Sequence, residues 1–146
     1  MKTARFVAVA VLMLGSSLAS HVVQSHTASG GAPLAETVTV AADELIPNLP
    51  GKRLVSHIVD YAPGASSAAH RHARSAFIYA YVLSGEIRSQ VDGEPARVYR
   101  AGEAWFENPG AYHRVGANAS DTAPARLLAV LIVDAADEQL VIPDPQ

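Results

Sequence analysis

Apolar and polar residues alternate in short runs from about residue 36 to the end of the chain. The runs are rich in β-branched, aromatic and aliphatic residues, and Gly, Pro, Asp and Asn separate them, which is the pattern of strands joined by turns. The strands that this pattern predicts span Thr37 to Val40, Arg53 to Tyr61, Phe77 to Leu83, Glu86 to Val91, Ala96 to Tyr99, Ala104 to Glu107, His113 to Ala117, Arg126 to Val133 and Leu140 to Ile142.

Two turn signals predict how neighbouring strands connect. Asp92-Gly93 lies between two alternating runs and is typical of a two-residue hairpin, and Ser84-Gly85 is a similar signal one strand earlier. The Ala-rich segment from Asp134 to Glu138 is too short for the crossover helix that a parallel sheet needs. We therefore expect an all-β antiparallel sandwich or small barrel, in which closure of the sheet also removes exposed strand edges.

Composition limits the number of domains and the classes of partner. The chain has 146 residues, of which 49% are hydrophobic and 17% charged, which suits one core but not two ordinary domains. Its formal net charge of -3 provides no basic field for a phosphate backbone, so nucleic acid is not an expected partner. The chain contains no cysteine, and its stability must therefore come from the core rather than from disulfides.

The N-terminus has the pattern of a signal peptide. A basic head at Lys2 and Arg5 precedes an apolar run from Phe6 to Leu14, and Ser17-Leu18-Ala19 fits the small-x-small rule for cleavage. The alternative is a membrane anchor, but the run is well short of the ~20 residues that a transmembrane helix needs. We expect residues 1–19 to be removed and the mature protein to be periplasmic or secreted, with no membrane association after cleavage.

The segment after the expected cleavage site reads as a flexible linker. Residues 20–35 are rich in Ser, Gly and Ala without a sustained period. His21 and His26 lie in this segment and are interpreted as solvated side chains. The single β-barrel domain is then expected to occupy residues 36–146.

Three histidines are the candidate metal ligands. His70 and His72 are two residues apart on an extended segment, so their imidazoles point to the same face. His113, from another strand, would complete a face of three nitrogens and leave other coordination positions open to water or substrate. The alternative is that these are surface histidines, which are common at this spacing.

The residues around these histidines resemble the motifs of the cupin superfamily. The first family motif is G-x5-H-x-H-x3/4-E-x6-G, and the second is G-x5-P-x-G-x2-H-x3-N. The matching residues, which lie between about Arg53 and Val133, are Gly64, His70, His72 and Gly85 for the first motif and Gly102, Gly110 and His113 for the second. The resemblance implies a double-stranded β-helix (jelly-roll) barrel that holds one divalent transition metal, whether Fe, Mn, Ni, Cu or Zn.

The family's motif-one glutamate is absent from the expected position. Counting along the motif places Ile78, Ala76 or Phe77 in that slot, and none of them is a carboxylate. In the second motif Asn108 replaces the proline. Three neutral imidazoles alone would leave the charge of a divalent ion uncompensated by the protein, so the site is expected to favour an anionic ligand.

Two further residues are candidates for chemistry. Glu107, six residues before His113, can be a metal ligand, a hydrogen-bond acceptor for a ligand imidazole, or a solvated carboxylate at the end of a strand. His57 lies in the middle of a strand whose facing the alternation does not decide, and the alternative to chemistry is a buried or edge histidine. Glu107 and His57 are the candidate catalytic groups.

Alternation along one strand predicts the floor of the pocket. If the Ile78 slot faces inward, Ile78, Ala80 and Val82 line the pocket, and the outward stripe consists of Phe77, Tyr79 and Tyr81. That stripe can be half of a homodimer contact, or core between the sheet and the N-terminal segment. Which pair of the strand from Ala104 to Glu107 faces inward is left open.

Two functions follow from the resemblance. Cupins with three histidines are similar to quercetin-type dioxygenases, which implies a metal-dependent, dioxygenase-like oxidoreductase acting on a small anionic or chelating substrate. The alternative is a non-catalytic cupin that binds a small ligand or serves as an accessory protein. A fold alone does not decide between them.

Overall fold

The computed structural model describes residues 36–145, and every element in this range is a β-strand. The expected signal peptide, residues 1–19, and the expected linker, residues 20–35, lie outside the described residues. Within residues 36–145, no helix is long and apolar enough to cross a membrane.

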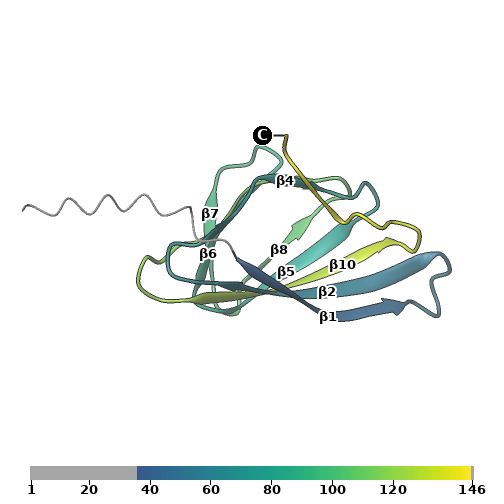
Figure 1. Cartoon of the computed structure of the whole chain (residues 1–146), viewed down its shortest axis with the longest axis horizontal. Helices are drawn as coiled ribbons and strands as arrows, with labels where there is room; N and C mark the ends of the chain where they lie inside the picture. Colours follow the sequence, from purple (N-terminus) through teal and green to yellow (C-terminus); the bar gives the residue numbers. More distant parts are fainter. Residues whose placement is uncertain (1–35, 146) are drawn as a thin grey trace, which may run out of the picture. The chain divides into compact units, whose positions relative to one another are not determined.

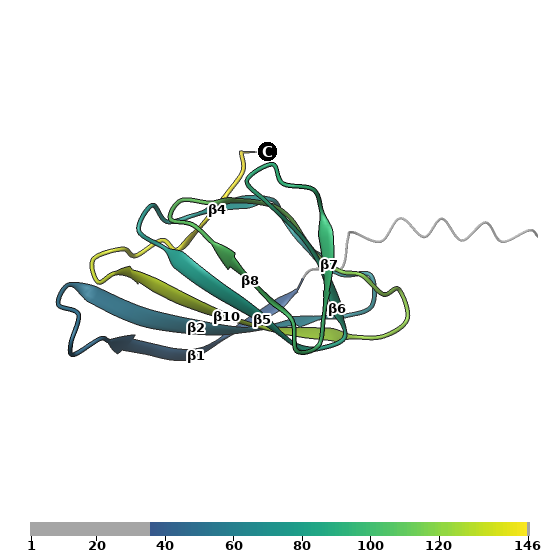
Figure 2. The ribbon, with the colours of Figure 1, turned by 180° about the vertical axis from the view of Figure 1, so that it is seen from behind.

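Two antiparallel sheets form a jelly-roll barrel (Figure 1). The first sheet has the order β1 (Thr37–Leu45), β2 (Lys52–Tyr61), β10 (Ala125–Asp134), β5 (Phe77–Ser84) and β8 (Ala104–Glu107). The second has the order β11 (Val141–Pro143), β4 (His70–His72), β9 (Tyr112–Asn118), β6 (Glu86–Val91) and β7 (Arg97–Arg100), and β3 (Ser66–Ser67) also pairs with β9. In the opposite view, strands β5, β8 and β10 of the first sheet lie below β4 of the second sheet, and β6 and β7 lie at one side of them (Figure 2).

The structure confirms the all-β antiparallel prediction and the position of each expected strand. The first strand is longer than expected, because β1 continues to Leu45 through a bulge after Val40. Two short strands, β3 and β4, were not among the expected runs. The alternation rule did not detect them because two or three residues are too few to show a period.

Of the two turn interpretations, the one at Ser84-Gly85 is wrong, and the one at Asp92-Gly93 is right about the hairpin but not about its two-residue loop. Ser84-Gly85 is not a hairpin, because β5 pairs with β10 and β8 whereas β6 pairs with β7 and β9 in the other sheet. Gly85 instead forms the corner between the sheets, with a φ of 72°. Asp92-Gly93 does lie at the tip of the β6–β7 hairpin, where both residues have positive φ. The loop is longer than two residues, since the last paired positions are Ser89 and Arg97.

The inward and outward faces of β5 agree with the predicted alternation, and Ile78 and Ala80 line the cavity as expected, but Val82 does not. Ile78, Ala80 and Val82 are buried in the core. On β8, the inward pair is Trp105 and Glu107, which settles the question left open by the sequence.

The outward aromatic residues form a stripe on the opposite face of the same sheet. Phe106 is 63% exposed and stacks on Phe77 with ring centroids 5.7 Å apart, and Tyr79 packs beside Phe106 at 5.3 Å. A homodimer through this stripe stays a prediction.

Candidate metal centre

Pairing between two strands brings the three predicted ligands together. His70 and His72 lie on β4, and the Cα of His70 is paired with that of His113 on β9. Ring centroids are 4.7 Å apart for His70 and His72 and 5.2 Å apart for His70 and His113. One potential ligand atom from each histidine lies within 4.8 Å of the others, so the three side chains could hold one metal ion. The structure thus brings together the residues that the motif selected.

Hydrogen bonds fix the orientation of two of the imidazoles. The Nδ1 atom of His70 lies 2.8 Å from the backbone oxygen of Ala68, and because a carbonyl only accepts, Nδ1 carries the proton. The Nε2 atom of His70 therefore keeps its lone pair for a metal. The Nε2 atom of His113 lies 3.0 Å from the hydroxyl of Ser89, which is itself buried. Such partners around a metal-binding histidine set its tautomer and ring angle.

Burial keeps these imidazoles in the form that binds metal. The loss of hydration on burial lowers the pKa of His70 and of His113 below the ordinary value for histidine. The ionised Glu107 partly opposes this effect in both cases. A neutral imidazole offers a lone pair, so the site is prepared to bind a cation at neutral pH.

Glu107 is a buried carboxylate beside the histidines. It is 2% exposed, and its Oε2 lies 3.1 Å from Nε2 of His72, while its Oε1 lies 3.6 Å from Nδ1 of His113. The indole N–H of Trp105 donates to Oε1 at 3.0 Å. Burial alone would raise the pKa of Glu107, but the contact with His72, the imidazole of His113 and the Trp105 bond outweigh it and lower the pKa. The carboxylate is therefore ionised at neutral pH.

The site contains buried polar atoms that no protein group satisfies. Among the residues of the described range, both ring nitrogens of His72 and the Oε2 atom of Glu107 are buried without a hydrogen-bond partner. His72 Nε2 and Glu107 Oε2 are close, but they are not aligned for a hydrogen bond. Unpaired buried polar atoms are costly, and a metal ion that accepts the lone pair of one His72 nitrogen and of Glu107 Oε2 would remove part of this cost. The residues present thus fit a divalent transition metal.

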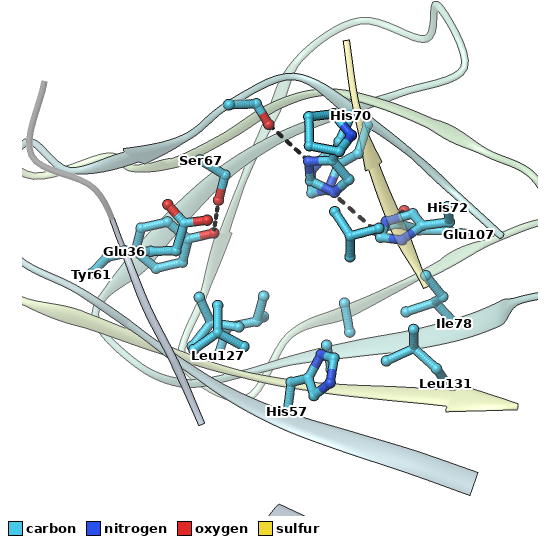
Figure 3. Close-up of a pocket in the computed structure, with 18 residues that line it drawn as sticks. Glu36, His57, Tyr61, Ser67, His70, His72, Ile78, Glu107, Leu127 and Leu131 are labelled. Carbon is cyan, nitrogen blue, oxygen red and sulfur yellow. Dashed lines mark hydrogen bonds and ion pairs between the residues drawn. The ribbon is translucent and has the colours of Figure 1, made fainter. Parts of the chain in front are cut away.

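The histidines and Glu107 face a cavity of about 300 Å³ inside the barrel (Figure 3). Its walls are mostly aliphatic, and the side chains that give them this character are Val59, Ile78, Ala80, Leu127, Ala129 and Leu131. A cavity of this kind suits a small molecule with an apolar body and few polar groups.

His57 also faces this cavity, which the sequence left undecided. It lies on β2 across the cavity from His70 (Figure 3). Burial, with the nearby His72 as a second cause, lowers the pKa of His57. His57 does not belong to the group of possible metal ligands. Its catalytic role, like that of Glu107, stays a prediction.

Sequence reasoning missed a second polar feature of the cavity. The hydroxyl of Tyr61 lies 2.8 Å from that of Ser67, and both residues, together with Glu36, line the end of the cavity away from Ile78 (Figure 3). Tyr61 shares the face of His57 on β2, since the two are four residues apart. Alternation along β2 would have assigned Tyr61 to the cavity if the sequence had shown that His57 faces it.

Comparison with known proteins identifies the family. A family model described as "Cupin domain" matches residues 57–131, which include all three histidines and Glu107. The chain belongs to the cupin family. A search of curated proteins found no match.

Solved cupin structures show the same fold. A recombinant oxalate oxidase in complex with glycolate is 27% identical, with a TM-score of 0.54, over 68% of this chain and 52% of that one. A Cupin 2 conserved barrel domain protein from Salinispora arenicola CNS-205 is 24% identical, with a TM-score of 0.52, over 69% and 77%. A protein with a double-stranded β-helix domain from Klebsiella pneumoniae is 16% identical, with a TM-score of 0.57, over 75% and 86%. This cupin thus spans about half the length of the oxalate oxidase chain.

Proposed function

We propose that this cupin is an exported, metal-dependent oxidoreductase of the dioxygenase-like type, acting on a small anionic or chelating substrate. The observation that carries the proposal is the convergence of His70, His72 and His113 on one side of an apolar cavity. Such an arrangement leaves coordination positions on the cavity side for a substrate.

The three imidazoles support Fe, Ni, Cu or Zn as the ion, and Mn, which prefers oxygen ligands, stays among the metals to test because of the nearby Glu107 carboxylate. When bound, such an ion supplies Lewis acidity and, for the redox-active metals, electron transfer with a chelated substrate. The three histidines would hold it, with the proton on Nδ1 of His70 leaving Nε2 available.

Other cavity residues would position the rest of the substrate. The aliphatic wall, which includes Ile78 and Leu131, would pack against an apolar body and exclude water. His57, across the cavity from His70, is the candidate general base, since its lowered pKa leaves it unprotonated at neutral pH. The paired hydroxyls of Tyr61 and Ser67 offer hydrogen bonds at the far end.

The size and lining of the cavity favour a substrate with a chelating head and an apolar body. A solved oxalate oxidase structure contains glycolate, which supports oxygen-chelating acids as one class to test. The aliphatic wall, in contrast, supports larger diketones, flavonols or thiols.

A non-catalytic cupin that binds a small ligand is the second candidate. The observation that favours it is the scarcity of proton-transfer groups among the residues that line the cavity. Apart from the three histidines and Glu107, the lining offers His57 and, at the far end, Glu36. In that case the metal would serve only to hold an anionic group of the ligand.

Oxygen consumption and product analysis separate the two candidates. The mature protein, loaded in turn with Fe(II), Mn(II), Ni(II), Cu(II) or Zn(II), is incubated with oxalate, diketones, flavonols and thiols. An oxidoreductase should turn over at least one candidate, and His57→Gln should reduce kcat by about 10²-fold or more while leaving metal content unchanged. Binding of a candidate without turnover in every metal form would contradict the proposal and support the ligand-binding alternative.

A further inference from the structure

The carboxylate that the motif lacks on β5 is present on the adjacent strand β8. The Cα atoms of Ile78 and Glu107 are direct partners in the antiparallel pairing of β5 with β8. Both side chains point into the cavity. Neighbouring strands lie about 4.8 Å apart, and a glutamate side chain is long enough to span this distance. A carboxylate on β8 can therefore reach the place that the family's glutamate would reach from β5.

The unpaired atoms show where this carboxylate is directed. The Oε2 atom of Glu107 and the Nε2 atom of His72 are 3.1 Å apart, both are buried, and no hydrogen bond joins them. Two donor atoms bound to one ion at about 2.0–2.2 Å and roughly at right angles lie about 3 Å apart. This separation fits two ligands of one ion, although the group of described residues whose donor atoms all lie within 4.8 Å of one another contains the three histidines and not Glu107.

A further contact holds the glutamate in one orientation. The Oε1 atom of Glu107 accepts the indole N–H of Trp105 at 3.0 Å, and Trp105 packs on Tyr99 with ring centroids 4.6 Å apart. Only Oε2 is left without a partner. A carboxylate held at one oxygen and unpaired at the other is arranged to bind a metal through a single oxygen.

We propose that Oε2 of Glu107 is a fourth protein ligand of the ion held by His70, His72 and His113, taking from β8 the role that the resemblance assigns to a glutamate on β5. The inference rests on the proposed metal site. A divalent ion would then retain a net charge of about +1 rather than +2, and a six-coordinate ion would keep two open positions. Such a site should select a bidentate ligand with a single negative charge.

Co(II) is a suitable probe because its visible spectrum reports the ligands directly. Wild type and Glu107→Gln are titrated with Co(II) in competition with a chelator. Glutamine keeps the shape of the side chain and the acceptor for Trp105 but removes the charge. Affinity should fall by about a hundredfold or more, because a direct ligand contributes more than an outer partner whose loss costs roughly ten- to a hundredfold. The absorption bands should also shift, and added azide should bind more tightly to the variant, since a charge is lost and a position opened.

Glu103→Gln is the matched control. Glu103 lies just before the same strand, but it bonds the backbone of Arg100 and is partly exposed. The same change of charge there should leave Co(II) affinity and spectrum as in wild type. Circular dichroism checks the fold, and if Glu107→Gln does not fold, Glu107→Asp replaces it. Aspartate keeps the charge but withdraws the oxygen, so affinity should again fall and the spectrum shift.

The outcomes separate this inference from the proposed function. If wild type binds no Co(II), the metal site itself is wrong, and both fail. If wild type binds Co(II) but the Glu107 variant has the same spectrum and azide affinity, Glu107 is not a ligand. A weaker affinity with an unchanged spectrum also excludes direct ligation, because it leaves Glu107 only a hydrogen-bonding role.

Discussion

At the scale of single residues, the cavity has apolar walls and a few polar groups, each kept in place by its own contacts. The clearest case is Tyr61, which is 3% exposed and whose hydroxyl is bonded to that of Ser67. Burial raises the pKa of Tyr61 to about 12, because the phenolate would lose its hydration inside the barrel. The phenol is thus neutral in the folded protein at physiological pH. It can act there only as a hydrogen-bonding group.

The raised pKa predicts a loss of stability at alkaline pH. The unfolded chain releases the Tyr61 proton near pH ~10, whereas the folded protein keeps it up to about pH 12. Stability from this group is therefore intact below pH ~10 and falls as the pH rises towards 12, by at most about 2–3 kcal/mol. Urea unfolding at several pH values measures this, and Tyr61→Phe should show a shallower decline. Equal alkaline losses in wild type and variant would contradict the assignment, since all other tyrosines are common to both.

The sequence predicted some of these residues and not others, for physical reasons. His70 and His72 could be assigned to one face because the period of a strand is local information. The contact of Glu107 with His72 could not be predicted, because it depends on the register of β8 against β5 and of β4 against β9. The family motif places its glutamate on β5, and a carboxylate supplied by the neighbouring strand β8 lies outside the motif's spacing.

At the scale of elements, a single glycine at a corner determines how the two sheets join. A Cβ atom at Gly85 would lie 2.6 Å from the backbone oxygen of Pro124 and 2.8 Å from Ala125. The dipeptide Ser84-Gly85 resembles a hairpin in the sequence because a glycine signals a turn but not which strands pair across it. The pairing is decided by β10 and β9, which lie far away in the sequence.

Comparison of two glycines tests this close approach. Gly85 and Gly93 both have positive φ, at 72° and 79°, but a Cβ at Gly93 would meet nothing within 4 Å. Gly93→Ala should therefore cost only the conformational strain of about 1–2 kcal/mol. Gly85→Ala should cost at least about 3 kcal/mol, because backbone atoms must also move. Urea unfolding of the two variants gives the difference, and equal losses would show that the corner is not tightly packed.

At the scale of the whole molecule, the barrel has two buried apolar clusters. One buried cluster includes Val59, Tyr61 and Trp105, and a second includes Ile78 and Leu131. The sequence sufficed to predict the fold, because the alternating strands and both cupin motifs agree with each other. It did not predict the cavity, whose shape depends on packing across the two sheets. The three histidines thus lie on a framework with an apolar core of its own, which we expect to fold without an ion.

The metal content of the mature protein tests the three-histidine metal centre most directly. The protein is purified without a histidine tag, analysed for bound metals and then titrated with Fe, Mn, Ni, Cu and Zn, alongside His70→Ala, His72→Ala, His113→Ala and, as a control, His57→Ala. We expect about one divalent ion per chain in wild type and in the His57 variant, and a marked loss in the other three with the β-rich circular dichroism retained. A folded wild-type protein that carries no metal and takes up none of the five would contradict the metal centre.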